Sequence, residues 1–362
     1  MDNFVVSARK YRPQEFDTVV GQSHITQTLE SAIKENQLAQ AMLFCGPRGV
    51  GKTTCARILA RKINEENGEK GEQDFAFNIF ELDAASNNSV DDIRNLTDQV
   101  RYAPQVGKYK VYIIDEVHML SNAAFNAFLK TLEEPPPHAI FILATTEKHK
   151  IIPTILSRCQ IYDFKRITIS DIINHLKDIA EKENVKYEED ALYLIAQKAD
   201  GALRDALSIF DRMVTFTHKN LSLSSVSDNL NILDYDYYLN ITDLALGNDI
   251  PSLLVSFNEI LKKGFDGHIF ISGLGSHFRD LMVAQNPQTI ELLEIGEKTK
   301  EKYIVQGKKC TSQFLIDAIE ICNQADINYR QSKNQRLTVE IALMQLASIT
   351  SSQSELKKKS LA

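Results

Sequence analysis

The stretch GPRGVGKTT at residues 46–54 constrains the fold of this chain more than any other. It follows the apolar run AMLFCG, precedes the helix-forming segment CARILARKI, and matches the spacing G-x-x-x-x-G-K-[ST]. Glycines at this spacing let backbone N–H groups converge on a phosphate, and the N-terminus of the following helix adds partial positive charge. We expect Lys52 to reach β- and γ-phosphate oxygens and Thr53 to place its hydroxyl on Mg²⁺. The residues assigned to phosphate binding are Gly46, Pro47, Arg48, Gly49, Val50, Gly51, Lys52, Thr53 and Thr54.

Five β-rich runs alternate with helix-length segments over the first 165 residues. Each run is short and largely apolar, which is typical of strands in a parallel sheet covered by helices on both faces. The runs are AMLFCG (41–46), NIFELDAA (78–85), KVYIID (110–115), AIFILATT (139–146) and QIYDF (160–164). We therefore predict an α/β nucleotide-binding domain over residues 1–165, built on a parallel five-stranded sheet.

The third run ends in two carboxylates that complement the phosphate-binding loop. In VYIIDEVHML (111–120), Asp115 is placed to hold Mg²⁺ or its water, and Glu116 to polarise an attacking water as general base. An isolated Asp-Glu pair at a strand end is common. In a chain that also carries a phosphate-binding loop, the pair favours nucleotide hydrolysis over nucleotide binding alone. His118 is interpreted as a local structural or coupling residue.

The fourth run ends in Thr145 and Thr146. Their hydroxyls are suited to sensing a γ-phosphate or orienting a water molecule. Threonine also simply suits the end of a strand, and the dipeptide alone favours that second interpretation.

The rest of the chain is predicted to be helical. Residues 166–228 carry three short helices and form a small lid domain. The serine-rich LSLSSVSDNL (221–230), at the C-terminal boundary of this domain, is interpreted as a linker or exposed turn. Residues 229–350 show apolar positions at helical spacing and form a further helical domain. The polar tail, 351–362, lacks a helical face and is predicted to be disordered. A length of 362 residues fits two or three domains.

Composition excludes several classes of protein. A net charge of −7 gives no global basic face, although a local basic surface, or one shared by several subunits, stays compatible with it. The five cysteines are scattered without C-x-x-C spacing, which favours reduced thiols in the cytoplasm over a disulfide framework or a zinc site. No apolar run approaches the roughly 20 residues of a membrane span, and the N-terminus does not resemble a secretory signal.

Several segments together resemble the AAA+ ATPases and, more narrowly, the gamma/tau subunits of bacterial DNA polymerase III, which are the ATPases of the sliding-clamp loader. The resemblance covers nearly the whole chain except the tail. The segments are ARKYRPQEFDTVVGQ (8–22), ELDAASNNSVDDIR (81–94), RYAP (101–104), IIDEVHMLSNAAFNAFLKTLEEPP (113–136), LATTEKHKIIPTILSRC (143–159), GALRDALSIFD (201–211) and NQRLTVEIALMQLA (334–347).

The resemblance implies roles for residues that their spacing alone does not assign. Thr146 occupies the sensor-1 position of the family. Arg204, in GALRDA, resembles the sensor-2 arginine that reaches from the lid to the γ-phosphate. Arg158, in the SRC motif, resembles the arginine finger that acts on the nucleotide of a neighbouring subunit. The adenine-side box implicates Tyr11, Arg12, Pro13, Val20 and Gly21.

The resemblance also implies an architecture and a set of partners. The family fold is an AAA+ module, a helical lid and a helical collar that holds a pentameric ring together. Its ATP hydrolysis, with Mg²⁺, drives loading of the sliding clamp onto primer–template DNA, alongside the delta and delta-prime subunits. Family members are classed with DNA-directed DNA polymerases because they belong to that holoenzyme; no polymerase chemistry is visible in this chain.

Two features depart from the family pattern. Family members typically carry a four-cysteine zinc module after the phosphate-loop helix, but no cysteine lies between Cys55 and Cys159 here. We therefore expect no zinc, and a short, acidic, glycine-containing insert at 64–74 in its place. Some relatives have basic side chains at helix starts that track DNA. Here the corresponding residues are Asn87, Asn88, Ser89 and Asn122, for which helix capping is the favoured interpretation and DNA contact leans on the resemblance.

Two alternatives remain open at this stage. One is another AAA+ machine, either a replication factor C-like subunit or a branch-migration motor. The other is a non-hydrolysing scaffold subunit like the delta-prime subunit of the loader, against which the intact Lys52, Thr53, Asp115 and Glu116 argue. The sequence does not decide between a short gamma-like form and part of a longer tau-like form; only a longer form is expected to bind the polymerase and the helicase.

Overall fold

A computed structural model describes residues 5–65, 78–104, 107–230, 233–293 and 295–360. The chain divides into two compact units. The first comprises Met1–Lys182 with Ala196–Arg212, and the second Glu183–Ile195 with Met213–Ala362. The predicted domain boundaries at 165 and 228 therefore remain predictions, because both units take residues from the segment assigned to the lid.

The first unit is built on the parallel sheet that the sequence predicts. Its strands are β1 (Ala41–Cys45), β2 (Ile79–Asp83), β3 (Lys110–Asp115), β4 (Ala139–Thr145) and β5 (Gln160–Asp163). They lie in the order β2-β3-β4-β1-β5, and every neighbouring pair is parallel. β1 and β4 are buried along their whole length, whereas the edge strand β2 is partly exposed. The prediction of five parallel strands is confirmed.

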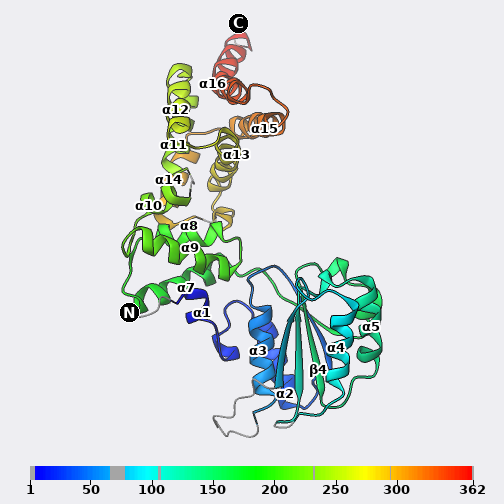
Figure 1. The fold of residues 1–362 in the computed structure, drawn as a ribbon. Coiled ribbons are helices and arrows are strands. Elements are labelled where there is room, and N and C mark those ends of the chain that lie inside the picture. Colours follow the sequence, from blue (N-terminus) through cyan, green and yellow to red (C-terminus); the bar gives the residue numbers. More distant parts are fainter. Residues whose placement is uncertain (1–4, 66–77, 105–106, 231–232, 294, 361–362) are drawn as a thin grey trace. The chain divides into compact units, whose positions relative to one another are not determined.

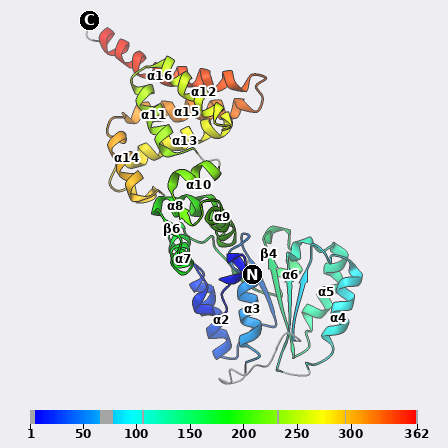
Figure 2. The same ribbon diagram turned by 60° about the vertical axis from the view of Figure 1, so that its left-hand side comes forward.

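Helices cover both faces of this sheet, as Figures 1 and 2 show. On one face, α2 (Ser23–Lys34) and α3 (Lys52–Lys62) pack their apolar side chains against Met42, Phe44 and Ile142. On the other, α4 (Val90–Val100) and α5 (Asn122–Glu133) pack against Leu43, Tyr112 and Phe141. Burying a single phenylalanine or leucine side chain stabilises the fold by roughly 1.5–3 kcal/mol, so these two layers fix the strand ends in place.

Short elements connect the strands and carry several of the predicted site residues. They are α1 (Ser7–Lys10), η1 (Phe16–Thr18), η3 (Val117–Met119), η4 (Lys148–Lys150) and α6 (Pro153–Leu156). After the sheet come α7 (Ile169–Lys182), β6 (Lys186–Tyr187), α8 (Glu189–Lys198), α9 (Leu203–Phe216), β7 (Asn220–Leu221) and α10 (Leu223–Leu230).

The interpretation of 221–230 as a linker is wrong. Its first residue, Leu221, is the last residue of β7 and pairs with β6, and residues 223–230 form α10. Val226 and Leu230 are buried at helical spacing. The Ser222 hydroxyl accepts a hydrogen bond from the N–H of Ser225 at 3.3 Å, so a serine that resembled linker composition caps the helix.

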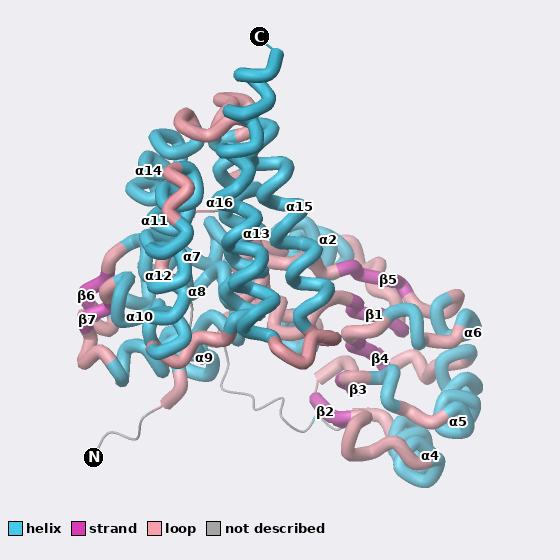
Figure 3. The backbone as a smooth tube through the Cα atoms, turned by 90° about the horizontal axis from the view of Figure 1, so that it is seen from above, coloured by secondary structure: helices cyan, strands magenta, loops and turns pink. Residues whose placement is uncertain are grey.

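The second unit continues as helices, which confirms the predicted helical C-terminal region. They are α11 (Tyr235–Leu246), α12 (Ile250–Lys262), α13 (Gly267–Ala284), η5 (Ile290–Leu292), α14 (Glu297–Gly307), α15 (Ser312–Tyr329) and α16 (Gln335–Ser360). α13 and α15 run side by side through its core (Figure 3). α16 continues to Ser360, so residues 351–360, for which the sequence predicts a disordered tail, are helical in the structure.

A neutral polar cluster lies inside this second core. His277 is buried and stands between the Tyr303 hydroxyl, 2.7 Å from Nδ1, and the Thr242 hydroxyl, 3.0 Å from Nε2. Burial lowers the pKa of His277 to about 3. The three side chains come from α13, α14 and α11, so the cluster ties these helices together through groups that satisfy one another.

Candidate active site

The phosphate-binding loop runs from the end of β1 to the start of α3, as the sequence predicts for this motif. Lys52 is the first residue of α3 and is only 6% exposed. Its ammonium group donates to the carbonyl oxygens of Gly46 at 2.8 Å and Pro47 at 2.7 Å. Burial lowers the pKa of Lys52, while the nearby carboxylates of Glu116 and Asp115 act in the opposite direction. The amine is thus held inside the loop, where a phosphate group would compete for it.

Two glycines are required by the close packing around the pocket. Gly46 has φ +147°, and a Cβ there would lie 2.4 Å from the carbonyl oxygen of Phe164. Gly21 has φ +71°, and a Cβ there would lie 2.9 Å from the side chain of Ile167, which lines the pocket. Neither position tolerates a side chain without moving the backbone or the pocket wall.

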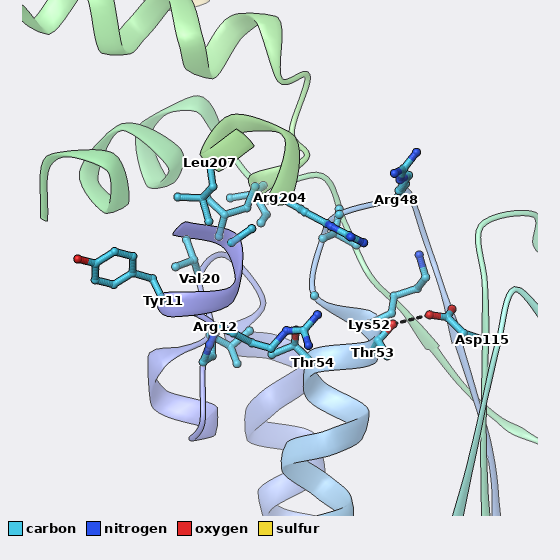
Figure 4. A pocket seen from close by; sticks show the side chains of 18 of the residues that line it. Tyr11, Arg12, Val20, Arg48, Lys52, Thr53, Thr54, Asp115, Arg204 and Leu207 are labelled. Atoms are coloured by element: carbon cyan, nitrogen blue, oxygen red, sulfur yellow. Dashed lines mark hydrogen bonds between the residues drawn. The ribbon is translucent and has the colours of Figure 1, made fainter. Parts of the chain in front are cut away.

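A hydroxyl and a carboxylate meet beside the loop. The Thr53 hydroxyl donates to Asp115 Oδ2 at 2.8 Å, the contact drawn as a dashed line in Figure 4. The two residues come from α3 and from the last position of β3, so the parallel sheet brings them together. Hydroxyl and carboxylate oxygens are ligands that Mg²⁺ prefers.

Glu116, the first residue after β3, has an unusual backbone conformation. Its φ of 49° and ψ of 43° lie in the left-handed region, which is costly for a residue with a side chain. Its N–H donates to Asp115 Oδ1 at 3.0 Å. Its carboxylate accepts from the Thr146 hydroxyl at 3.0 Å and from the Thr146 N–H at 3.4 Å. The end of β4 therefore holds the carboxylate that follows β3.

His118 lies behind this carboxylate and joins it to the end of β4. Its Nδ1 is 3.0 Å from the Thr145 hydroxyl and 3.4 Å from Glu116 Oε2, and its Nε2 is 3.5 Å from Glu147 Oε2. The sequence-based interpretation of a local structural or coupling residue remains open, and these contacts are compatible with it.

A pocket joins the loop to an apolar wall. Its lining includes Tyr11, Arg12, Pro13, Val20, Arg48, Gly49, Val50, Gly51, Lys52, Thr53, Thr54, Asp115, Glu116 and Arg204, all assigned from the sequence. In Figure 4, Val20 and Leu207 lie toward Tyr11, whereas Lys52, Thr53 and Asp115 lie at the other end. The pocket is therefore apolar toward one end and charged at the other.

Sequence reasoning missed part of this wall. The missed residues are the apolar side chains of Ala8, Val19, Ile167, Leu203 and Leu207. Leu203 and Leu207 lie one turn apart on α9 and flank Arg204, so the helical spacing around the arginine was a usable signal. Ile167 follows β5 in a loop and carries no such signal.

Three arginines enter the same pocket from separate segments: Arg12, Arg48 and Arg204. The pKa of Arg12 is lowered by burial and by the neighbouring guanidinium groups of Arg57 and Arg204. Crowded cations of this kind are stabilised when a polyanion binds between them.

Some residues assigned to the site lie elsewhere. Gly21, Gly46, Pro47, Thr146 and Arg158 do not line the pocket, although Thr146 and the two loop residues contact residues that do. Arg158 follows α6, where its guanidinium pairs with Glu133 Oε1 at 2.5 Å and donates to the Thr154 carbonyl at 2.6 Å. Its side chain is 32% exposed.

The four residues considered for DNA contact lie at helix starts. Ser89 caps α4 in a reciprocal capping box with Asp92. The Asn87 side chain donates to the Asp83 carbonyl at 3.1 Å, and Asn122 is the first residue of α5. The Asn88 carbonyl accepts from the Ser121 N–H at 3.4 Å, so the starts of α4 and α5 lie together.

Within the described part of the chain, no group of three or more histidine, cysteine or carboxylate side chains is arranged to hold a metal ion. The predicted insert at 64–74 lies largely outside the described residues, so the expectation of no zinc stays a prediction. A membrane-crossing helix is likewise not found among the described helices, none of which is both long and apolar enough.

Comparison with known proteins identifies the family. Residues 21–168 match a family model described as "DNA polymerase III, delta subunit", and residues 171–219 one described as "DNA polymerase III clamp loader subunit, ATPase lid domain". A RuvB structure from Thermotoga maritima aligns with a TM-score of 0.50 at 22% identity, covering 68% of this chain and 85% of that one, which supports the fold alone.

Curated relatives extend the match to nearly the whole chain. DNA polymerase III subunit tau of Bacillus subtilis is 41% identical over 353 residues, or 93% of this chain, and this chain spans 62% of that relative. DNA polymerase III subunit gamma of Buchnera aphidicola subsp. Acyrthosiphon pisum is 34% identical over 363 residues, covering 96% of this chain and 99% of the relative. The chain belongs to the gamma/tau family of DNA polymerase III subunits.

Proposed function

We propose that this chain is an ATP-hydrolysing subunit of the bacterial clamp loader, acting within the DNA polymerase III holoenzyme. The observation that carries the proposal is the pocket, which gathers Lys52, Thr53, Asp115, Glu116 and Arg204 around one phosphate-binding loop. Family membership supports the same function. A scaffold subunit that does not hydrolyse nucleotide has no need of this complete set.

ATP and Mg²⁺ fit the residues present. The apolar wall around Val20 and Leu207 suits a purine base, and the crowded guanidinium groups suit a triphosphate. The Thr53 hydroxyl and the Asp115 carboxylate, 2.8 Å apart, would hold Mg²⁺. When bound, the ion supplies charge neutralisation at the β- and γ-phosphate oxygens.

The side chains of this chain divide the work of hydrolysis among them. Lys52 exchanges the carbonyl oxygens of Gly46 and Pro47 for phosphate oxygens. Glu116 accepts a proton from the attacking water as the water oxygen bonds to the γ-phosphorus and the bond from that phosphorus to the bridging oxygen of ADP breaks, so that ADP and phosphate leave. Thr146 holds the Glu116 carboxylate and orients that water, and Arg204 draws the lid helix α9 onto the phosphates.

Arg158 acts on the nucleotide of a neighbouring subunit. Support comes from its place outside the pocket of its own chain, on an exposed surface after α6. An arginine finger stabilises the charge that develops on the transferred phosphoryl group, and such residues contribute on the order of 10³–10⁵ in rate.

The proposed partners follow from the family. They are the delta and delta-prime subunits in a pentameric ring, the sliding clamp and primer–template DNA, all in the cytoplasm. The adjacent starts of α4 and α5 offer backbone N–H groups to DNA phosphates, with Asn87, Asn88, Ser89 and Asn122 as the nearby polar side chains. Polymerase and helicase contacts belong to a longer C-terminal form.

ATP hydrolysis by the reconstituted loader tests the proposal. The parent complex is expected to hydrolyse ATP faster when clamp and primer–template DNA are added, and a Glu116→Gln complex to bind ATP but lose hydrolysis by about 10²–10⁴-fold. Absence of hydrolysis by the parent complex with clamp and DNA present would favour the scaffold function. A hexameric ring in light scattering would favour a branch-migration motor.

A further inference from the structure

The N-terminal segment of the described chain forms one side of the pocket. Ala8, Tyr11, Arg12 and Pro13 all line it. The only regular element of this segment is α1, a single helical turn of four residues. A helix of that length has no stability of its own in water, so contacts with the rest of the unit must hold it in place.

One carboxylate on α9 provides such a contact. Asp211 Oδ2 accepts from the Ser7 N–H at 2.7 Å, and Oδ1 accepts from the Ser7 hydroxyl at 2.5 Å. Ser7 is 6% exposed. Two hydrogen bonds to one ionised group, partly shielded from water, are among the stronger polar contacts in proteins.

The same face of α9 completes the pocket. Arg204, Leu207 and Asp211 are spaced three and four residues apart, so their side chains follow one another along one side of the helix. Arg204 and Leu207 line the pocket, and the Arg204 N–H donates to the Gly49 carbonyl at 3.4 Å. One helix face thus contacts the phosphate-binding loop at its start and the N-terminal segment two turns later.

We propose that Asp211 is a positioning residue for nucleotide binding, which holds the N-terminal segment against the base end of the pocket. The inference rests on the proposed nucleotide function. Its effect is largest on the affinity for ligands that carry a base, because Lys52 and Thr53 at the loop and Asp115 on β3 do not belong to the N-terminal segment, whose one pocket-lining cation is Arg12.

Calorimetric titration of the full chain with two ligands tests this proposal. ATP occupies both ends of the pocket, whereas inorganic tripolyphosphate occupies only the loop end. For Asp211→Asn we expect ATP affinity to fall about tenfold, the scale of one lost charge-assisted hydrogen bond. Tripolyphosphate affinity should fall less, by no more than about threefold, because Arg12 is the one cation of this segment that lines the pocket. Ser7→Ala, which keeps the backbone donor, should show a smaller loss of the same kind.

The matched control is Asp178→Asn, which removes the same charge from an exposed position on α7 and should leave both affinities unchanged. Trypsin provides a second readout, because the exposed Arg9 and Lys10 lie on α1. Cleavage there should be faster in Asp211→Asn than in the parent without nucleotide.

Two results would overturn the inference. One is unchanged ATP affinity in Asp211→Asn; the other is an equal loss for ATP and tripolyphosphate, which would indicate general damage to the unit. A parent chain that binds neither ligand would instead count against the proposed function.

Discussion

The pocket and the surface that carries Arg158 belong to the same compact unit but are organised differently. The residues of the pocket lie near strand ends and hydrogen-bond to one another or to the loop. Lys52 donates to a carbonyl group of the loop, and Asp115 accepts from the Thr53 hydroxyl and from the Glu116 N–H. The Arg158 guanidinium hydrogen-bonds to none of them; it pairs with Glu133, the last residue of α5, and donates to the Thr154 carbonyl on α6.

Under the proposed function, this difference divides the work of hydrolysis between neighbouring subunits. Residues in the pocket change the nucleotide site of their own chain. A guanidinium on an exposed surface changes hydrolysis only where another molecule brings a nucleotide to it. Substitutions in the pocket should therefore weaken ATP binding by the substituted subunit. Substitution of Arg158 should slow hydrolysis at the site of the neighbouring subunit and leave ATP binding unchanged.

The largest effect is expected from Arg158→Ala in all family subunits of the loader. ATP affinity should stay within twofold of the parent, because Arg158 does not line the pocket. Hydrolysis by the assembled loader should fall by about 10³-fold or more. Nucleotide titration and steady-state phosphate release measure the two quantities.

The matched control for this substitution is Arg279→Ala, which removes a 54% exposed, ion-paired arginine from the second unit. It should leave hydrolysis unchanged. Loss of ATP binding in Arg158→Ala would contradict the separation between the two regions.

Lys52→Ala should give the opposite pattern. Losing the buried ammonium should weaken ATP binding by about 10–100-fold, the scale of one charged hydrogen-bonding group. Without nucleotide the variant should be as stable as the parent, because the burial that lowers the pKa of Lys52 is a cost of keeping the cation in place. Titration and urea unfolding check the two statements; normal ATP affinity would contradict the assignment.

His277 lies in the second unit and does not line the pocket, so its substitution should change the stability of the fold and not ATP hydrolysis. Its folded pKa is about 3, below the unfolded value of about 6.5, so the unfolded chain binds the extra proton first as the pH falls. The stability it contributes is complete above about pH 6.5 and decreases by up to about 1.4 kcal/mol per pH unit toward pH 3. His277→Gln should lack this component, as measured by urea unfolding of both proteins at pH 7 and pH 5.

Hydrolysis by loaders that contain His277→Gln should match the parent at pH 7.5. If parent and variant lose stability in parallel between pH 7 and pH 5, the buried cluster does not behave as a neutral one.

The smallest effect is expected from Glu133→Gln. Its ion pair with Arg158 is partly exposed, and such pairs contribute about 0–1 kcal/mol, so hydrolysis should change by no more than about fivefold. A loss as large as that of Arg158→Ala, measured by the same phosphate release, would mean that Arg158 acts through Glu133 inside its own chain.

Much of the pocket could be predicted because the residues that carry its chemistry lie in short sequence motifs. The loop, Asp115 and Glu116 lie at strand ends, and parallel strands bring such ends to one edge. The apolar wall could not be predicted in the same way. Helical spacing around Arg204 offered a signal for Leu203 and Leu207, but Ile167 reaches the pocket through tertiary packing that no local pattern encodes.

Composition misled the prediction in two places. Serines at 222–227 resemble a linker, yet one of them caps α10 while Val226 and Leu230 pack inward. The polar residues at 351–360 lack an apolar face, yet α16 extends through them. The contact of Asp211 with Ser7 joins residues 204 positions apart and had no signal in the sequence.

Mixing two inactive variants tests the central claim, that each nucleotide site is completed by Arg158 of the next subunit. Lys52→Ala subunits keep Arg158 but bind ATP poorly, whereas Arg158→Ala subunits bind ATP but lack the finger. Loaders assembled from both, with clamp and primer–template DNA present, should hydrolyse ATP far faster than loaders assembled from either variant alone. Hydrolysis no faster than that of the two separate variants would contradict the account.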